Sequence, residues 1–239
     1  TMTYFDSSVV KLIVTYGGDD STRFIAESCV AVSHTAIECT SVPGRGWNHS
    51  VQVTVAGTAG PVSSATVRYA TPTVDQIEGP GAKFAMTKGG QEIEVSGENF
   101  GPTGPLFGYL IYGHPTATNT QKICEDDPDM DLVCDERRGV LFKGYSENEL
   151  GGPRRTDLIF EAVDCRVTSP NVKIKCLSGE GTGLNHYWVL HIDGISSRPT
   201  FGNNSYAIPV VTAYAGDGAK DADTSGGQVV IIIGRDFGT

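Results

Sequence analysis

The chain repeats itself at a fixed offset of 137 residues, and this repeat constrains the fold more than any other feature. At this offset Cys39 matches Cys176, and Asn48-His49 matches Asn185-His186. The same register aligns two Gly-Gly-Gln segments, two Tyr-Ala-x-Pro segments and two corners of the form Asn/Asp-Phe-Gly, at 89–91 and 226–228, 69–72 and 206–209, and 99–101 and 236–238. The chain therefore builds one structural unit more than once.

The repeating unit is shorter than the offset. Upstream of the first cysteine the match changes register, because 14–17 resembles 110–113 at an offset of 96. The second copy thus carries about 40 extra residues, and the underlying unit has about 97, the size of one immunoglobulin-like sandwich. We predict the C-terminal part of a domain at 1–70, a complete domain at 71–207 with an insertion at about 114–157, and the first strands of a further domain at 208–239.

The segments between turn signals are short and typical of strands. Residues 50–55 and 91–95 alternate polar with apolar side chains, the pattern of a sheet with one face in a core. Gly pairs and Pro interrupt the chain at the spacing found in β-sandwiches. We therefore predict an all-β fold of tandem sandwiches. One short helix is predicted in the insertion, where Asp127 can cap, Pro128 suits the first turn and Arg137-Arg138 suit the end.

Charge and hydropathy argue against two classes of partner. The sequence has 18 Lys and Arg against 28 Asp and Glu, a net charge of −10. Nucleic-acid affinity comes largely from clustered Lys and Arg, so binding of DNA or RNA is not expected. The longest apolar run is the five residues 229–233, and a membrane-spanning helix needs roughly 20. No membrane span is predicted in this segment.

Six cysteines occur as three closely spaced pairs and predict three local disulfides. No pair has the Cys-x-x-Cys form of zinc sites and thioredoxin-like motifs. The predicted bonds are Cys29–Cys39, Cys124–Cys134 and Cys165–Cys176, and free buried thiols are the alternative. N-glycosylation sequons begin at Asn48 and Asn203. Disulfides and sequons together favour a secreted or cell-surface protein.

The histidines do not form a catalytic or metal-binding pattern. His186 and His191 are five residues apart on a predicted strand, so they point to opposite faces. His191 shares a face with Asp193, which we interpret as a solvated strand face. His49 and His186 are equivalent repeat positions, which indicates packing or surface polarity. The sequence also lacks a Gly-x-Ser-x-Gly elbow and a His-Glu-x-x-His motif. We predict no enzymatic activity, no catalytic residue and no cofactor.

The insertion holds the densest group of acidic residues. Seven of the 28 acids lie within 125–136. Asp127, Asp129 and Asp131 are spaced like the first ligands of an EF-hand loop, and carboxylate oxygens suit Ca²⁺. The glycine expected at the sixth position is absent, and a cysteine interrupts the rest of the pattern. We favour a solvated acidic loop closed by Cys124–Cys134, with a Ca²⁺ site as the alternative.

The order of glycines and cysteines resembles that of IPT/TIG domains, the immunoglobulin-like folds of plexins, related receptors and some transcription factors. The opening of the family pattern is similar to 72–79 and 89–101, and its later half is similar to 29–57 and to the second copy from 165 to 194. The paired cysteines match the extracellular branch of the family. The motif residues have structural roles: Gly97 and Gly101 are expected at positive φ around the corner, and Phe100 is expected in the core.

The two ends of the chain complement each other. Residues 1–70 lack the first two strands of a unit, and 208–239 supply only those two. Read in succession, 234–239 followed by 1–17 forms a continuous family pattern. We expect a linear array, either one period of a longer tandem polypeptide or subunits that complete each other head to tail. An arbitrary boundary is the alternative.

The predicted assembly contact joins strands of 208–239 to 1–70 of the next unit. Val229, Ile231 and Ile233 share one strand face. We expect them to face inward, toward Val10, Leu12 and Val14. The predicted function is that of an extracellular structural protein that forms a fibre, a surface filament or an adhesive stalk. A receptor or adhesin ectodomain with a ligand site in the insertion is the main alternative, and a carbohydrate-associated accessory domain is a third.

Overall fold

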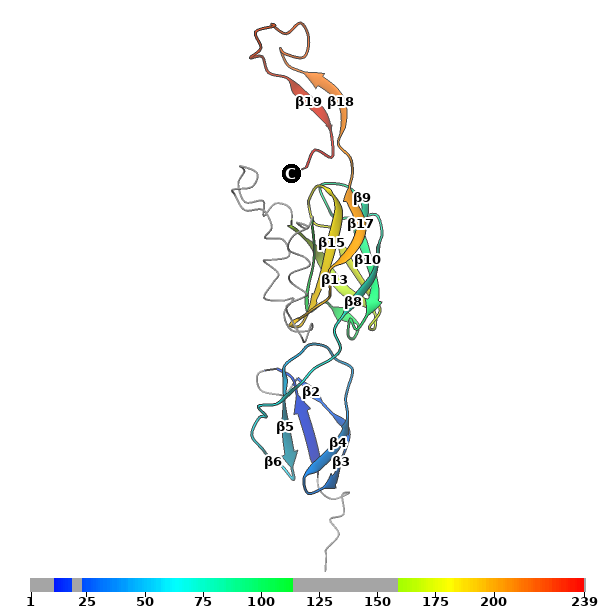
Figure 1. Ribbon diagram of the computed structural model, residues 1–239, viewed down its shortest axis with the longest axis vertical. Helices are drawn as coiled ribbons and strands as arrows, with labels where there is room; N and C mark the ends of the chain where they lie inside the picture. The colour runs from blue at the N-terminus through cyan, green and yellow to red at the C-terminus, as the bar shows by residue number, and fades with distance from the viewer. Residues whose placement is uncertain (1–10, 19–22, 114–158, 239) are drawn as a thin grey trace, which may run out of the picture.

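The computed structural model describes residues 11–18, 23–113 and 159–238, and all regular structure in these residues is β-strand. Three groups of strands follow one another along the long axis of the molecule (Figure 1). The prediction of an all-β fold is confirmed. The helix predicted in the insertion lies outside the described residues.

The first group combines a five-stranded sheet with a separate hairpin. In the sheet β1 lies between β2 and β5, and β6 and β7 both pair with β5. The strands of the sheet are β1 (Leu12–Tyr16), β2 (Phe24–Ile25), β5 (His49–Val55), β6 (Thr58–Ala59) and β7 (Thr66–Val67). The hairpin consists of β3 (Glu27–Ser33) and β4 (Ala36–Thr40), which pair only with each other among the described strands.

The middle group is a ten-stranded system. Its main path runs β8-β10-β14-β13-β12-β15-β17-β9, with β11 on β13 and β16 on β15. The strands are β8 (Thr73–Glu78), β9 (Lys83–Ala85), β10 (Glu92–Glu98), β11 (Gly104–Pro105), β12 (Gly108–Gly113), β13 (Ile159–Ser169), β14 (Lys173–Leu177), β15 (Leu184–Ile192), β16 (Ile195–Ser196) and β17 (Thr200–Tyr206). The long β13 pairs with β12 through its first part and with β14 through its second.

The core of the middle group comes from alternate residues of these strands. In β10, Ile93 and Val95 are fully buried, and the intervening Glu94 faces outward toward Lys173. Strands from both halves of the path contribute to the same apolar cluster, including Ile77, Ile174, Leu110, Tyr112, Trp188 and Leu190. Alternation at period two therefore separates one core face from one charged face.

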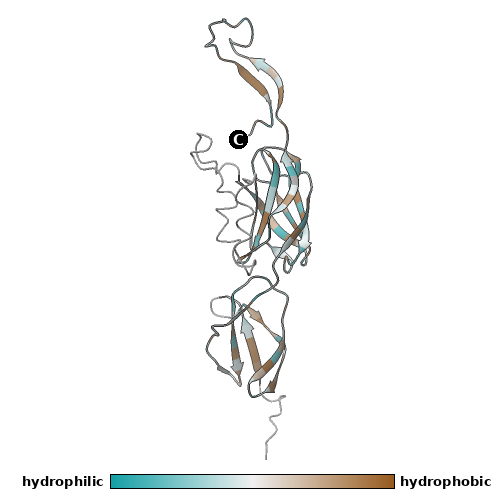
Figure 2. Ribbon diagram, viewed as in Figure 1, coloured by the Kyte–Doolittle hydropathy of each residue, from teal (hydrophilic) through white to brown (hydrophobic). Residues whose placement is uncertain are grey.

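The third group is the hairpin of β18 (Val210–Ala215) and β19 (Ile231–Arg235). Its apolar residues are exposed on both faces, and Figure 2 shows β19 coloured as hydrophobic. The exposed fraction is 51% for Ile231 and 54% for Ile232, which lie on opposite faces of β19, compared with 0% for Ile93 and Val95 of β10. Among the residues that the structure describes, the hairpin thus lacks the covering layer that the middle group has.

Strand pairing repeats together with the sequence. The β3–β4 hairpin pairs Glu27↔Thr40 through Ser33↔Ala36, and β13–β14 pairs Val163↔Leu177 through Ser169↔Lys173, with register shifts at equivalent places. The β18–β19 hairpin likewise reproduces β8–β10, residue for residue at the offset of 137, including its irregularity. The three groups are therefore built on one template.

The glycine corner differs from its expectation at one position. Gly101 and Asn99 have φ values of 81° and 62°, as the turn requires. Phe100 is fully buried, as expected. The expectation of positive φ at Gly97 was wrong. This glycine serves a close approach of two strands instead, because a Cβ atom there would lie 2.0 Å from the carbonyl oxygen of Thr73.

Candidate functional site

A cluster of four rings occurs once in each of the first two groups. Tyr16, Phe24, His49 and Tyr69 have ring centroids 5.3–6.4 Å apart. The equivalent rings of the middle group have centroids 5.4–6.3 Å apart, and they are Tyr112, Phe160, His186 and Tyr206. His49 and His186 are both buried, and each bonds through Nε2 to the carbonyl oxygen four residues earlier. Packing, one of the two roles predicted for these histidines, is therefore their role.

The two tyrosines of each cluster close a hydrogen-bond ring on one backbone residue. The Gly179 amide donates to the Tyr112 hydroxyl, which donates to Tyr206, and Tyr206 donates back to the Gly179 carbonyl, at 3.0, 2.7 and 2.7 Å. Tyr16, Tyr69 and Val42 form the same ring. Burial raises the pKa of Tyr112 and of Tyr206 above the ordinary tyrosine value. These hydroxyls are therefore held neutral as structural links.

The interpretation of His191 and Asp193 as a solvated strand face was wrong. His191 is buried, its ring stacks on Tyr109 at 4.5 Å, and its Nδ1 lies 3.0 Å from the Ser196 hydroxyl. Asp193 instead forms an ion pair with Arg23 of the first group at 2.5 Å. The turn after β15 directs this carboxylate away from its strand and toward the neighbouring group.

The ion pair belongs to a junction between the first and middle groups. The Arg45 guanidinium lies 3.7 Å from the centroid of the Phe107 ring, and that of Arg23 lies 5.8 Å from it. Such contacts between a cation and a ring contribute about 0.5–1 kcal/mol at exposed sites. Burial, followed by the nearby Arg23 charge, lowers the pKa of Arg45, and Asp193 opposes that shift. The junction thus concentrates opposite charges and one aromatic ring.

Backbone approaches at the junction require glycine. A Cβ atom at Gly194 would lie 2.2 Å from the indole nitrogen of Trp47, and one at Gly46 would lie 2.5 Å from the Asp193 carboxylate. Both glycines have positive φ, a conformation that few other residues adopt. The two groups are therefore in close contact over a set of residues without room for side chains.

The second junction, between the middle group and the β18–β19 hairpin, repeats part of the first. A Cβ atom at Gly101 would lie 3.3 Å from Arg45, and one at Gly238 would lie 2.7 Å from Thr182. Both members of the second contact are the repeat equivalents of the first. In addition, the Thr87 amide donates to the Asp236 carboxylate at 3.5 Å. One contact therefore recurs at both ends of the middle group.

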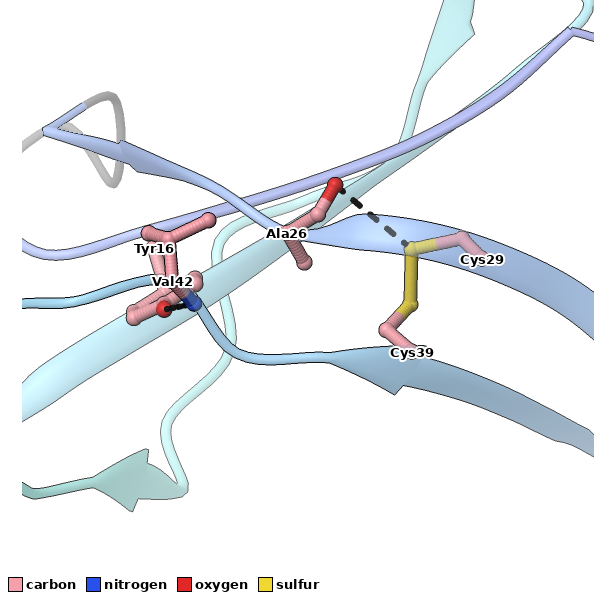
Figure 3. The surroundings of a disulfide bond; sticks show 5 residues. All are labelled: Tyr16, Ala26, Cys29, Cys39 and Val42. Carbon is pink, nitrogen blue, oxygen red and sulfur yellow. Dashed lines mark hydrogen bonds between the residues drawn. A yellow bond between two sulfur atoms is a disulfide. The ribbon is translucent and has the colours of Figure 1, made fainter.

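Two of the three predicted disulfides are present. Cys29–Cys39 joins β3 to β4, and Cys165–Cys176 joins β13 to β14 at the equivalent place. In Figure 3 the Cys29 sulfur lies beside the Ala26 carbonyl oxygen, at 4.0 Å. The same figure shows the Val42 amide donating to the Tyr16 hydroxyl at 3.1 Å, so the disulfide adjoins the ring cluster. The predicted Cys124–Cys134 bond lies outside the described residues.

The predicted glycosylation and assembly residues are placed as follows. Asn48 is exposed, and Asn203 lies in β17, where its side chain is not described. Val229, Ile231 and Ile233 are exposed at one end of the molecule, Leu12 and Val14 lie in β1 toward the other end (Figure 1), and Val10 is outside the described residues. The described residues of the two predicted halves therefore do not meet within one chain.

The structure identifies no metal centre in the residues it describes, since no three His, Cys, Asp or Glu side chains gather there. The candidate Ca²⁺ ligands Asp127, Asp129 and Asp131 lie outside those residues. Within the same part of the chain, no helix is long and apolar enough to cross a membrane.

Sequence reasoning missed the junction residues. Arg23, Arg45 and Phe107 come from three different loops, and no spacing rule connects loops that meet only in the folded chain. One available signal was Phe107 itself, an aromatic residue in a Gly- and Pro-rich segment with no place in the strand alternation. Its side chain is 54% exposed to solvent.

No protein-family model, curated protein or solved structure matches the chain.

Proposed function

We propose that the chain is part of an extracellular structural protein, a linear array of IPT/TIG-type immunoglobulin-like domains that forms a fibre, surface filament or adhesive stalk. The three groups correspond to the end of one domain at 1–70, a complete domain at 71–207 and the start of another at 208–239. Strand order and pairing in the middle group suit a sandwich of two sheets linked through the long β13.

The observation that carries this proposal is the recurrence of one contact at both ends of the middle group. Gly101 on Arg45 and Gly238 on Thr182 are the same pair of positions, one period apart. A unit that contacts its two neighbours through the same head-to-tail surfaces generates a rod or a helical filament, because the contact does not close on itself. Such an array is suited to form a long, stiff structure.

The chemistry of the side chains supports a structural role in an oxidising compartment. Both described disulfides staple a hairpin, and disulfides persist outside the reducing cytosol. The exposed Asn48 sequon suits glycosylation there. His49, His186 and His191 are occupied in ring packing and hydrogen bonds. These arrangements favour mechanical stability, and we propose no catalytic activity and no nucleic-acid partner.

Electron microscopy of the native material tests the proposal. We expect thin, unbranched filaments or stalks whose density repeats at one constant axial spacing, and antibodies against 71–207 should label them at that spacing. Compact particles, or antibody label confined to single sites beside a membrane, would overturn the array in favour of a receptor ectodomain.

A further inference from the structure

The β3–β4 and β18–β19 hairpins have outer strand edges that are unpaired among the described residues, including the edges of β4 and β19. In the middle group, β10 lies between β8 and β14, and β14 lies between β10 and β13. The equivalents β19 and β4 have only their hairpin partners, β18 and β3. In the middle group, the edges of β10 and β14 pair with each other. The equivalent edges, those of β19 and β4, are unpaired in the two hairpins.

Core positions of both hairpins are exposed in the same way. Ile174 of β14 is fully buried, and its equivalent Ile37 in β4 is 40% exposed. Ile93 and Val95 of β10 are also fully buried, and their equivalents, Val230 just before β19 and Ile232 within it, are roughly half exposed, at 48% and 54%. An exposed apolar face with a free edge marks an incomplete sheet.

We propose that the β18–β19 hairpin of one copy of this chain completes the sheet of a second copy, with β19 pairing antiparallel to β4. This inference rests on the proposed linear array and specifies the contact that extends it. The two edges lie at opposite ends of the molecule (Figure 1), so β19 does not pair with β4 of the same chain. Addition of a strand to a free edge is an established mode of protein association.

The middle group fixes the register of this contact. There Ile93 pairs with Cys176, Glu94 with Lys175 and Val95 with Ile174. Transferred by the repeat offset, Val230 pairs with Cys39, Ile231 with Glu38 and Ile232 with Ile37. A shift of one residue would turn every core side chain to the outer face, so the template specifies one arrangement.

The same template reverses the faces of β19 expected from the sequence. Val229, Ile231 and Ile233 correspond to Glu92, Glu94 and Ser96, which all lie on the outward side of β10 in the middle group. Val230 and Ile232 correspond to the two buried residues. We therefore assign Val230 and Ile232 to the core of the completed sheet and Ile231 to its outer face.

Two lysine substitutions in adjacent positions test the assignment in the full chain. Ile232→Lys would place an unpaired ammonium in the core, which lowers the association constant by more than about tenfold. Ile231→Lys would face Glu38 across the strands, as Lys175 faces Glu94 in the middle group, and should leave association unchanged or stronger. Sedimentation velocity over a range of concentrations measures both. Equal effects of the two substitutions, or a larger effect at position 231, would overturn the assignment.

Cross-linking tests the register of the contact and whether a second copy of the chain provides the strand that pairs with β4. A chain with Ile231→Cys is mixed with a chain that carries Glu38→Cys. The Cβ atoms of directly opposite residues on paired strands lie about 4.5–5.5 Å apart, within reach of a disulfide. We expect a linked dimer whose new bond joins these two cysteines in peptide maps. A matched mixture with Thr40→Cys, two residues out of register, should link several-fold less. No linked dimer, or equal linkage in both mixtures, would overturn the inference.

The result separates this inference from the proposed function. Constant axial spacing in native filaments without linkage between copies would leave the array intact and show that neighbouring stretches of one polypeptide complete the sheets. Linkage between copies in material that forms no filaments would retain the strand contact and reject the array.

Discussion

Each ring cluster depends on two tyrosine hydroxyls and one backbone residue. The backbone residue is Val42 in the first group and Gly179 in the middle group, and the hydrogen bonds are the same. Only the amide and the carbonyl take part, so the side chain at that position is free to change between repeats. This explains why the sequence match retains both tyrosines and loses the residue to which they bind.

Removing one hydroxyl from this ring of hydrogen bonds should destabilise the middle group. Tyr206→Phe leaves the Gly179 carbonyl without its donor and the Tyr112 hydroxyl without its acceptor. A buried group left unpaired costs about 1–3 kcal/mol, and the midpoint of urea unfolding should fall accordingly. Tyr187→Phe is the control, since that tyrosine is only partly buried and packs on Phe201. An equal loss in the control would show that the ring contributes nothing special.

Alkaline pH should lower the free energy of unfolding of the middle group. Burial raises the pKa of Tyr112 and Tyr206 in the folded state, and an unfolded tyrosine titrates near 10. The unfolded chain therefore loses these protons first. Their contribution is complete below pH about 10 and is lost as the pH rises from there toward the folded-state values. Unfolding free energies measured between pH 8 and 11 should show this decline. A variant with Tyr112→Phe and Tyr206→Phe should show a smaller one.

At the scale of the element, the disulfides and the hairpins they join were predictable because cysteine spacing is local information. Cys29–Cys39 and Cys165–Cys176 each close one hairpin of two adjacent strands. Two cysteines separated by about ten residues are brought together readily when the chain between them folds back as a hairpin. The repeat offset supplied a second, independent reading of the same elements.

The inward face of β19 was not predictable from its own residues. All five residues from Val229 to Ile233 are apolar, so alternation at period two does not distinguish core from surface. In the equivalent strand β10, Glu92 and Glu94 alternate with Ile93 and Val95, and there the faces are distinct. Comparison with β10 is the basis on which we propose Val230 and Ile232 for the core. Phe107 and its arginines were missed because loop contacts follow no period.

Opening the middle disulfide should cost more than a surface change. Replacing Cys165 and Cys176 together by alanine frees a loop of 11 residues, for which the chain-entropy argument gives about 2–3 kcal/mol. Calorimetry of the variant should show a lower melting temperature for the middle group. Alanine at Cys29 and Cys39 is the matched control, and it should leave that transition in place. A shift of the same transition in the control would show that the two groups unfold as one.

At the scale of the whole molecule, stiffness depends on what lies between the groups rather than within them. The first junction joins Arg23, Arg45, Phe107 and Asp193 across two groups of strands. The second repeats only the contact of Gly238 with Thr182 and adds Asp236. Side chains at the junctions vary between repeats, and the backbone corner remains. In the proposed array, the corner would therefore set the direction from one group to the next, and the side chains would set how firmly each junction is held.

Phe107→Ala tests whether this side chain holds the first junction without contributing to the stability of the middle group. The side chain is half exposed, so the free energy of unfolding should change by no more than about 0.5 kcal/mol. The variant loses the ring beneath Arg45 and Arg23, so small-angle X-ray scattering should show a wider distribution of distances between the first group and the middle group. Phe201→Ala is the control, because Phe201 is about equally exposed and contacts Tyr187 within the middle group. An unchanged distribution in Phe107→Ala would show that the ion pair of Arg23 with Asp193 and the glycine contacts hold the joint without the ring.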